Sequence, residues 1–318
     1  MRVVAVVHGG PSLEHEVSLR SGRQVLEHID RSRYATLPVV IGSDGLWNVD
    51  GEGVGGALDG ARALLSRRCE VAFLALHGPF GEDGTIQGLL QAAGLRFTGG
   101  GLAASALARD KIRSKRFLRA YGIEGAPDLT CPPCTAAEVG RRLGWPAVVK
   151  DPHQGSTLGL AVVGGEREFD AAVARLAPGG ATLLVERREA GREFTVAVLE
   201  RDDGEPEALP VIEIRAPSGF FDYHAKYSDQ GAEEIVPAPV AAEVAREMQR
   251  LALTAHRALG LRGMSRTDLI LRPEGSLVFL ETNSIPGLTA RSLLPKAAAA
   301  AGIPFREVIT RLVEVALR

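Results

Sequence analysis

The sequence has few cysteines, few aromatic residues, no surplus of one charge and no long hydrophobic run. Three Cys in 318 residues cannot form a disulfide framework. A net charge of -2 gives no basic surplus that would draw the chain to nucleic acid or anionic lipid. Apolar runs such as residues 3–7 are too short to cross a bilayer, and no signal-peptide pattern is present. We therefore expect a cytoplasmic protein without nucleic-acid or membrane partners.

The overall composition is typical of a folded protein and is rich in glycine. Hydrophobic residues make up 45% and charged residues 24%, which excludes disorder over most of the chain. The length predicts about two domains, although three small domains also fit. The 37 glycines indicate many tight turns, or backbone lying close to a ligand.

The first third of the chain has the pattern of an open α/β sheet. An apolar run over residues 2–7 ends at His8-Gly-Gly-Pro11, which predicts a buried parallel strand feeding a turn. A helix is expected over residues 16–26, and further strands over 37–41 and 71–76. This spacing is typical of βαβ units.

From residue 105 the pattern changes to α+β. The expected helices cover residues 110–119, 166–176, 241–260, 292–301 and 304–318. The expected strands cover residues 147–150, 160–163, 182–186, 193–199 and 209–214, with a hairpin of strands over 268–271 and 277–281. The stretch 217–237 is predicted to be a long loop that is neither strongly hydrophobic nor of low complexity, and we interpret it as a lid.

Cys131 and Cys134 form a CxxC pattern in a Pro-rich connection. A redox pair would follow a strand and open a helix, and a structural zinc site would need four ligands. The sequence has no second cysteine pair, so a loop with incidental cysteines is favoured over both alternatives.

The last hairpin carries oxygen ligands. Asp268 opens one expected strand, Glu281 closes its neighbour, and Asn283 would share a face with Glu281 if the chain is extended. Oxygen donors of this kind suit Mg²⁺, which takes one or two carboxylates together with substrate phosphates. Solvated acids at a strand end are the alternative.

A second group of residues could hold a polyphosphate and a nucleoside. Lys150 ends a strand and precedes a loop containing Gly155, Ser156, Thr157 and Gly159, whose backbone N–H groups and hydroxyls could cradle phosphates. Glu186 and Glu193 border a short connection and could accept from adenine and ribose, although exposed acids are the alternative. With Lys111 and Arg266 as further cations, these groups indicate an enzyme that uses ATP and Mg²⁺.

Several short motifs follow one another along nearly the whole sequence. They are residues 8–19 (HGGPSLEHEVSL), 77–88 (HGPFGEDGTIQG), 105–111 (SALARDK), 155–159 (GSTLG), 193–198 (EFTVAV), 222–227 (DYHAKY), 266–268 (RTD), 281–287 (ETNSIPG) and 292–295 (SLLP). In their joint order and spacing, which are highly specific, these motifs resemble those of the D-alanine–D-alanine ligases of the ATP-grasp superfamily.

The resemblance implies an ATP-grasp fold of mixed α/β and α+β class. We expect an N-terminal open parallel α/β substrate domain over residues 1–104, a small central α+β subdomain over 105–186 and a C-terminal α+β subdomain over 187–318 with the lid at 217–237. The family also suggests a homodimer.

The resemblance implies roles for individual residues. The catalytic group would be Glu14, Ser156, Tyr227, Arg266 and the backbone N–H of Gly287. D-alanine would be bound by Glu14, His77, Arg266, Gly287, Ser292 and Leu293, and ATP by Lys111, Lys150, Ser156, Glu186, Glu193 and Lys226. Asp268, Glu281 and Asn283 would ligate two Mg²⁺ or Mn²⁺ ions.

The expected activity is the ATP-dependent joining of two D-alanine molecules through an acyl phosphate, for peptidoglycan precursor synthesis. Tyr227 favours a dipeptide, because in the family a Phe here accompanies ester formation with D-lactate. Two alternatives remain: a ligase for another amino-acid pair, and a nucleotide-binding protein of this fold that has lost catalysis.

Overall fold

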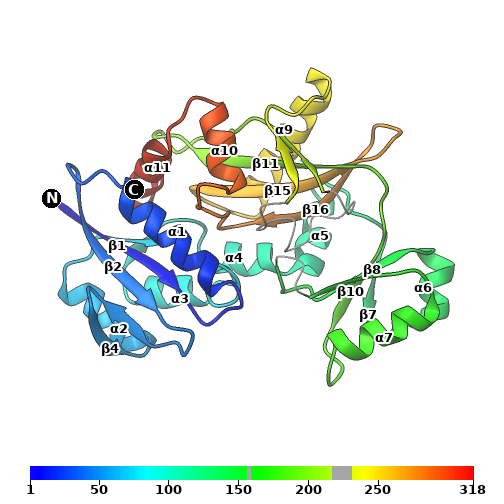
Figure 1. The fold of residues 1–318 in the computed structure, drawn as a ribbon, viewed down its shortest axis with the longest axis horizontal. Helices are drawn as coiled ribbons and strands as arrows, with labels where there is room; N and C mark the ends of the chain where they lie inside the picture. The colour runs from blue at the N-terminus through cyan, green and yellow to red at the C-terminus, as the bar shows by residue number, and fades with distance from the viewer. Residues whose placement is uncertain (156–158, 217–230) are drawn as a thin grey trace.

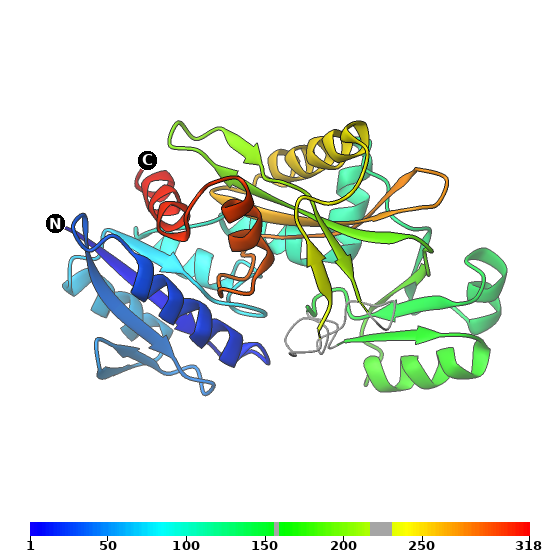
Figure 2. The same ribbon diagram turned by 45° about the horizontal axis from the view of Figure 1, so that its top comes forward.

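The structure is a computed structural model that describes residues 1–155, 159–216 and 231–318. Within these residues the strands form three sheets, which follow one another along the chain (Figures 1 and 2). Three residues of the predicted site, Ser156, Lys226 and Tyr227, lie outside the described residues.

The N-terminal sheet has the strand order β4-β3-β2-β1-β5-β6. Its strands are β1 (Arg2–Gly9), β2 (Tyr34–Ile41), β3 (Trp47–Val49), β4 (Glu52–Gly55), β5 (Val71–Leu74) and β6 (Arg96–Phe97). The helices of this part are α1 (His15–His28), α2 (Ala57–Ser66) and α3 (Thr85–Ala92). Strand β1 pairs in parallel with β2 and β5, which confirms the predicted α/β sheet and its buried first strand. The expectation of a parallel sheet holds only in part, because β3 pairs antiparallel with both β2 and β4.

The central sheet has the order β7-β10-β8-β9. Its strands are β7 (Asp128–Cys131), β8 (Ala147–Lys150), β9 (Leu160–Val163) and β10 (Leu183–Arg187), and its helices are α6 (Ala136–Arg142) and α7 (Glu166–Leu176). Helix α6 begins after Thr135, whose side chain accepts a hydrogen bond from the backbone N–H of Glu138. One face of the sheet carries a core with Val149, Phe169 and Val185.

The cysteine prediction was wrong in this region. Cys131 and Cys134 are joined by a disulfide at a Cα–Cα separation of 4.9 Å. Cys131 ends β7 and is buried in the core of the central sheet, so the pair belongs to the packing rather than to an open loop. A turn that brings two cysteines this close is a tertiary feature that the CxxC spacing alone does not reveal.

The C-terminal sheet has the order β14-β13-β11-β15-β16, and β12 also pairs with β11. Its strands are β11 (Arg192–Glu200), β12 (Pro206–Ala208), β13 (Ile212–Arg215), β14 (Glu233–Ile235), β15 (Met264–Leu271) and β16 (Leu277–Asn283). Helix α9 (Ala242–Ala258) packs on this sheet through residues such as Met248 and Ala252, and α10 (Leu293–Ala300) and α11 (Phe305–Leu317) complete the chain.

Two expectations for this part need correction. The stretch 217–237 is not irregular throughout, because β14 pairs with β13; its sequence, Glu-Glu-Ile, is too short and too polar to signal a strand. Residues 217–230, and with them most of the expected lid, lie outside the described residues. Asp268 does not open its strand, because β15 begins four residues earlier at Met264.

Helices α4 (Leu102–Arg109) and α5 (Lys111–Arg119) connect the N-terminal sheet to the rest of the molecule (Figure 1). Ala104, Ala108 and Leu118 from these helices pack in the core of the C-terminal sheet. The boundary expected between residues 104 and 105 falls inside α4. The three-domain division therefore remains a proposal, in which α4 and α5 pack with the C-terminal part.

None of the described helices is both long enough and apolar enough to cross a membrane.

Candidate active site

The register of the C-terminal sheet gathers polar side chains on one face. Asp268 on β15 lies opposite Glu281 on β16 and opposite Thr195 on β11, and Arg266 lies opposite Asn283. Because alternate residues of a strand share a face, these side chains point to the same side of the sheet. The three predicted metal ligands are thus brought together by strand pairing.

Asp268 is held in a fixed orientation by its neighbours. Arg266 donates to both carboxylate oxygens, with Nε 2.9 Å from Oδ1 and Nη2 2.8 Å from Oδ2. The Thr195 hydroxyl donates to Oδ1 at 2.6 Å. A carboxylate can accept about four hydrogen bonds, so ligation capacity remains. The buried Nδ2 of Asn283 has no hydrogen-bond partner among the described residues.

Lys111 lies at the start of α5, over the loop that follows β8. Asp110 caps the helix by accepting the backbone N–H of Arg113 at 2.9 Å. The Lys111 ammonium donates to the carbonyl oxygen of Gln154 at 2.8 Å and forms an ion pair with Glu281 Oε2 at 3.0 Å. One lysine therefore joins the phosphate loop predicted from the sequence to the predicted metal ligands.

Lys150 and Glu186 form a buried ion pair that also includes Lys115. Lys150 lies opposite Leu184 in the pairing of β8 with β10, so Glu186, two residues on, is its diagonal neighbour on the same face. The Glu186 carboxylate contacts the ammonium groups of both Lys150 and Lys115. Burial would lower the pKa of Lys150, but the charge of Glu186 outweighs it and raises that pKa. Burial likewise would raise the pKa of Glu186, and the two lysines lower it instead.

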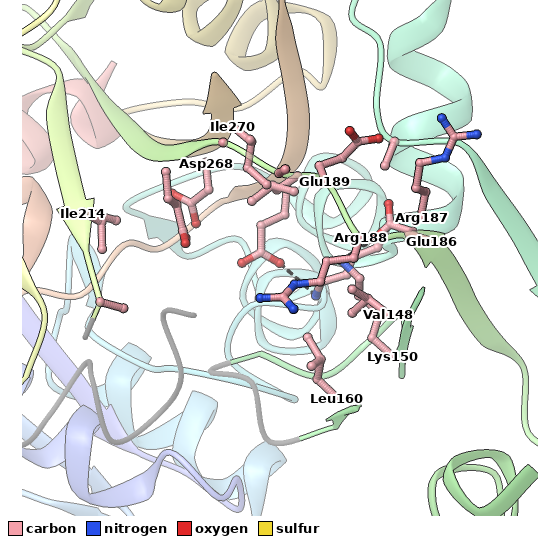
Figure 3. Close-up of a pocket in the computed structure, with 18 of the residues that line it drawn as sticks. Val148, Lys150, Leu160, Glu186, Arg187, Arg188, Glu189, Ile214, Asp268 and Ile270 are labelled. Carbon is pink, nitrogen blue, oxygen red and sulfur yellow. Dashed lines mark ion pairs between the residues drawn. The ribbon is translucent and has the colours of Figure 1, made fainter. Parts of the chain in front are cut away.

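These residues line a cavity of about 790 Å³, which we call cavity A. Apart from Asn283, every predicted nucleotide or metal residue that the structure describes lines this cavity, namely Lys111, Lys150, Glu186, Glu193, Asp268 and Glu281. In Figure 3 Val148 and Leu160 lie beside Lys150 on one side, and Ile214, Asp268 and Ile270 lie on the other. Small-molecule sites typically combine apolar walls with polar groups that orient the ligand. The large share of charged side chains in this lining suits a highly charged ligand.

A second cavity, of about 690 Å³, lies between the N-terminal part and the C-terminal sheet, and we call it cavity B. It is lined by all six residues predicted to bind D-alanine, which are Glu14, His77, Arg266, Gly287, Ser292 and Leu293. Asn283 also lines this cavity.

His77 and Glu14 are positioned by the turns that follow β5 and β1. His77 Nε2 lies 2.8 Å from the Ser21 hydroxyl, and His77 Nδ1 faces Glu82 Oε1 at 3.8 Å. Gly78 has a φ of +78°, and a Cβ there would lie 3.0 Å from Glu14 Oε2. Glycine is thus needed at position 78 both for the backbone angle and for the approach of Glu14.

Two residues of cavity B were given no role by the sequence analysis. Glu82 accepts a hydrogen bond from Arg109 Nη1 at 2.6 Å, and both side chains are buried. Burial would raise the pKa of Glu82, but its interactions with the nearby His77 and with the charge of Arg109 lower that pKa below its ordinary value. Arg109 lies inside the SALARDK motif, and this position was the one sign in the sequence that it belongs to the site. The motif does not indicate which residues Arg109 contacts.

The far end of cavity B is the N-terminus of α10. Ser292 is the residue before the helix, and its hydroxyl accepts the backbone N–H of Thr289 at 3.1 Å. A Cβ at Gly287 would lie only 2.6 Å from Ser292 Oγ, so this close approach requires glycine. Unpaired N–H groups and the helix dipole make such an end suitable for a carboxylate.

The two cavities meet at Gly155 and Glu281, which line both. Cavity A, with its lysines and oxygen ligands, suits a nucleoside polyphosphate. Cavity B, with Glu14 and the N-terminus of α10, suits a small zwitterion that carries an ammonium group and a carboxylate. Three sheets surrounding such a pair of joined cavities define an ATP-grasp ligase, an enzyme class that activates a carboxylate with ATP.

Comparisons with known proteins narrow this class. Residues 3–58 and 55–100 match the family model described as "D-ala D-ala ligase N-terminus", and residues 129–314 match "D-ala D-ala ligase C-terminus". The D-alanine–D-alanine ligase of Desulforudis audaxviator is 41% identical, over 99% of both chains. This chain belongs to the D-alanine–D-alanine ligase family.

Solved structures agree with that assignment. The D-alanine–D-alanine ligase of Coxiella burnetii superposes with a TM-score of 0.85 at 28% identity, covering 99% of this chain and 94% of that one. The VanG D-Ala:D-Ser ligase of Enterococcus faecalis superposes with a TM-score of 0.84 at 30% identity, covering 99% of both chains.

Proposed function

We propose that this chain joins two D-alanine molecules into D-alanyl-D-alanine, with release of ADP and phosphate, in the synthesis of peptidoglycan precursors. The observation that carries the proposal is the meeting of cavities A and B at Gly155 and Glu281. A phosphoryl group bound in one cavity can there reach a carboxylate bound in the other.

In the first step the carboxylate of the first D-alanine attacks the γ-phosphorus of ATP, and ADP leaves. Glu14 holds the ammonium group of this D-alanine, and His77 lies beside it. Lys111 and Lys150 neutralise the phosphates, while Glu186 and Glu193 face the nucleoside. Transfer of this kind depends on positioning and charge neutralisation more than on covalent help from the protein.

The acidic groups of cavity A fit divalent cations. Among its described lining residues, acidic side chains are at least as numerous as basic ones, so the cavity alone cannot neutralise a triphosphate. Asp268, Glu281 and Asn283 offer oxygen donors on one face, of the kind that Mg²⁺ or Mn²⁺ takes. Two such ions, when bound, would neutralise the β- and γ-phosphates.

In the second step the amine of the second D-alanine attacks the acyl phosphate. The carbonyl carbon gains a bond to nitrogen, the amine loses a proton, and the bond to phosphate breaks. Arg266 and the backbone N–H of Gly287 stabilise the oxyanion, and Ser292 and Leu293 hold the carboxylate of the incoming D-alanine. Ser156, Lys226 and Tyr227 keep the roles implied by the resemblance, as part of this proposal.

The direct test is phosphate release from ATP and Mg²⁺ with D-alanine present, absent, or replaced by L-alanine or D-lactate. Release that requires D-alanine, with D-alanyl-D-alanine found by mass spectrometry, would support the proposal. Absence of release with D-alanine, beside tight ATP binding, would point to another amino-acid pair or to a protein without catalysis.

A second candidate differs only in the amino acid that accepts the acyl group. The similarity to a ligase named for D-Ala and D-Ser motivates a D-serine arm in the same assay. With equal D-alanine and D-serine, we expect the D-alanyl-D-alanine product to dominate; a majority of D-alanyl-D-serine would favour this second candidate.

We also propose that the protein is a cytoplasmic homodimer, as its family resemblance suggests. Light scattering coupled to size-exclusion chromatography would test the dimer, and a mass of one chain at working concentration would contradict it.

A further inference from the structure

Arg109, the last residue of α4, lies where the two cavities adjoin. Its Nη1 donates to Glu82 Oε2 at 2.6 Å, and its Nε donates to the carbonyl oxygen of His153 at 2.7 Å. A Cβ atom built on Gly155 would lie 3.2 Å from Arg109 Nη1 and 3.6 Å from Glu14 Oε2. One guanidinium therefore contacts the N-terminal part on one side and the phosphate loop on the other.

The two partners of Arg109 belong to different sites. Glu82 accepts the backbone N–H of Gly78 at 3.2 Å and faces His77, so it belongs to the turn that shapes the pocket for the first D-alanine. His153 and Gly155 belong to the loop after Lys150, and Gly155 lines cavity A. The rigid, planar fork of the arginine thus links the two partners directly, so that movement of one can be transmitted to the other.

The burial of Arg109 makes a purely structural role an incomplete explanation. Its side chain is 7% exposed and lines cavity B. Within the described part of the chain, Nη2 is buried and has no hydrogen-bond partner. Buried donors are normally satisfied, and an apolar side chain of similar volume often stabilises a protein as well as a buried ion pair does. Nη2 lies 3.5 Å from the position that a Cβ of Gly155 would take, beside the loop that lines both cavities. A buried donor that no described residue satisfies, at the junction of two cavities, is better explained by a role in the occupied site than by stability alone.

We propose that Arg109 is a positioning residue that couples the two cavities, so that binding of the first D-alanine and binding of ATP favour each other. A D-alanine ammonium held near Glu14 fixes the turn with Glu82, and Arg109 then holds the phosphate loop in the place that ATP requires. Such coupling is reciprocal: each ligand tightens the other by the same factor. The inference rests on the proposed function.

The test is a binding linkage that needs no turnover. The dissociation constant of β,γ-methylene-ATP with Mg²⁺ is measured by calorimetry with and without saturating D-alanine. For the unmodified protein we expect D-alanine to tighten the analogue at least about fivefold, at the lower end of ordinary coupling. For Arg109→Met we expect this ratio to fall below about twofold, even if both affinities weaken.

Two further variants make the result interpretable. Arg246→Met makes the same chemical change on an exposed arginine of α9 and should leave the ratio unchanged. Arg109→Lys keeps the charge but cannot reach Glu82 and the His153 carbonyl with one fork, so its ratio should also fall. If Arg109→Met does not fold, Arg109→Lys carries the test.

The outcomes separate the inference from the function on which it rests. An unchanged ratio in the folded Arg109 variant would overturn the inference, because a merely structural arginine lowers stability without removing the linkage. A ratio near one in the unmodified protein that still forms dipeptide would also overturn it. Failure to form any dipeptide would instead count against the proposed function.

Discussion

Cavities A and B are built in different ways. The polar groups of cavity A stand mostly on paired strands: Asp268 opposite Glu281, and Lys150 diagonal to Glu186. The groups of cavity B come from turns and a helix end that are far apart in the sequence, such as those carrying Glu14 and Ser292. Strand register positions the first set, whereas the second set depends on how separate parts of the chain pack.

The two cavities also differ in how their charges are balanced. In cavity A each predicted phosphate lysine already has a carboxylate partner, Lys111 with Glu281 and Lys150 with Glu186. In cavity B the buried pair of Glu82 and Arg109 leaves one nitrogen without a partner in the described chain. Cavity A is therefore held together by its own charges, and cavity B retains a donor for another group. Variants in each cavity can test this contrast.

The largest effect is expected for Arg266, which lines cavity B and pairs with Asp268 of cavity A. Arg266→Ala should lower kcat by about 10²- to 10³-fold, because one donor to the developing oxyanion is lost. ATP should still bind, because the lysines of cavity A remain. Stopped-time assays of dipeptide formation measure turnover, and calorimetric titration measures ATP affinity. Near-normal turnover would contradict the role of Arg266 in stabilising the oxyanion.

The next largest effect is expected for Lys115, whose buried ammonium contacts Glu186 and lies 3.3 Å from Asp128. Lys115→Met leaves these carboxylates short of one cation and should lower the free energy of unfolding by about 3 kcal/mol. The matched control is Arg116→Met on the exposed side of the same helix, for which we expect a change within about 0.5 kcal/mol. Urea denaturation measures the free energy of unfolding of both variants. Equal losses would mean that the ion pair of Lys115 with Glu186 does not stabilise the protein.

A smaller effect, confined to acid, is expected for Glu82 in cavity B. Its pKa is lowered in the folded protein from an ordinary value of 4.5, so its contribution to stability is complete above that pH and is lost as the pH falls through the folded value. Between about pH 5 and about pH 3.5, the free energy of unfolding should therefore fall less steeply for Glu82→Gln than for the unmodified protein. The two slopes should differ by up to about 1.4 kcal/mol per pH unit. Urea denaturation at several pH values measures the slopes. Parallel slopes for the two proteins would show that this carboxylate does not carry the acid sensitivity.

The contrast between the cavities also explains how much the sequence could predict. Strands β8 and β9 and helix α7 were predicted with the observed bounds, because short apolar runs and the turn residues that bound them are local signals. The shared face of Glu281 and Asn283 followed from the two-residue period of a strand. Cavity A was therefore accessible from spacing, and cavity B was accessible only through the resemblance to a family.

What the sequence did not reveal depends on contacts between distant segments. Lys115 acquires its role from Glu186, 71 residues away, and Arg109 acquires its role from Glu82 and His153. Arginine and lysine in helices are usually solvated, so composition gives no reason to expect them buried. The strand β14 was missed for another reason: its three residues carry no alternation, and only pairing with β13 makes it a strand.

The smallest effect on turnover is expected for the disulfide of Cys131 and Cys134, because neither residue is among the described lining of cavity A or cavity B. The bridge spans a sequence separation of 3, and closing so short a loop stabilises a protein by about 2 kcal/mol at most. A reductant should therefore lower the free energy of unfolding by that amount and leave kcat unchanged. A double variant, Cys131→Ala with Cys134→Ala, should show no response to the reductant, which separates the bridge from the buried thiol of Cys69. A loss of turnover on reduction, absent in the double variant, would mean that the central sheet transmits the state of this bridge to Lys150 through β8 and β10.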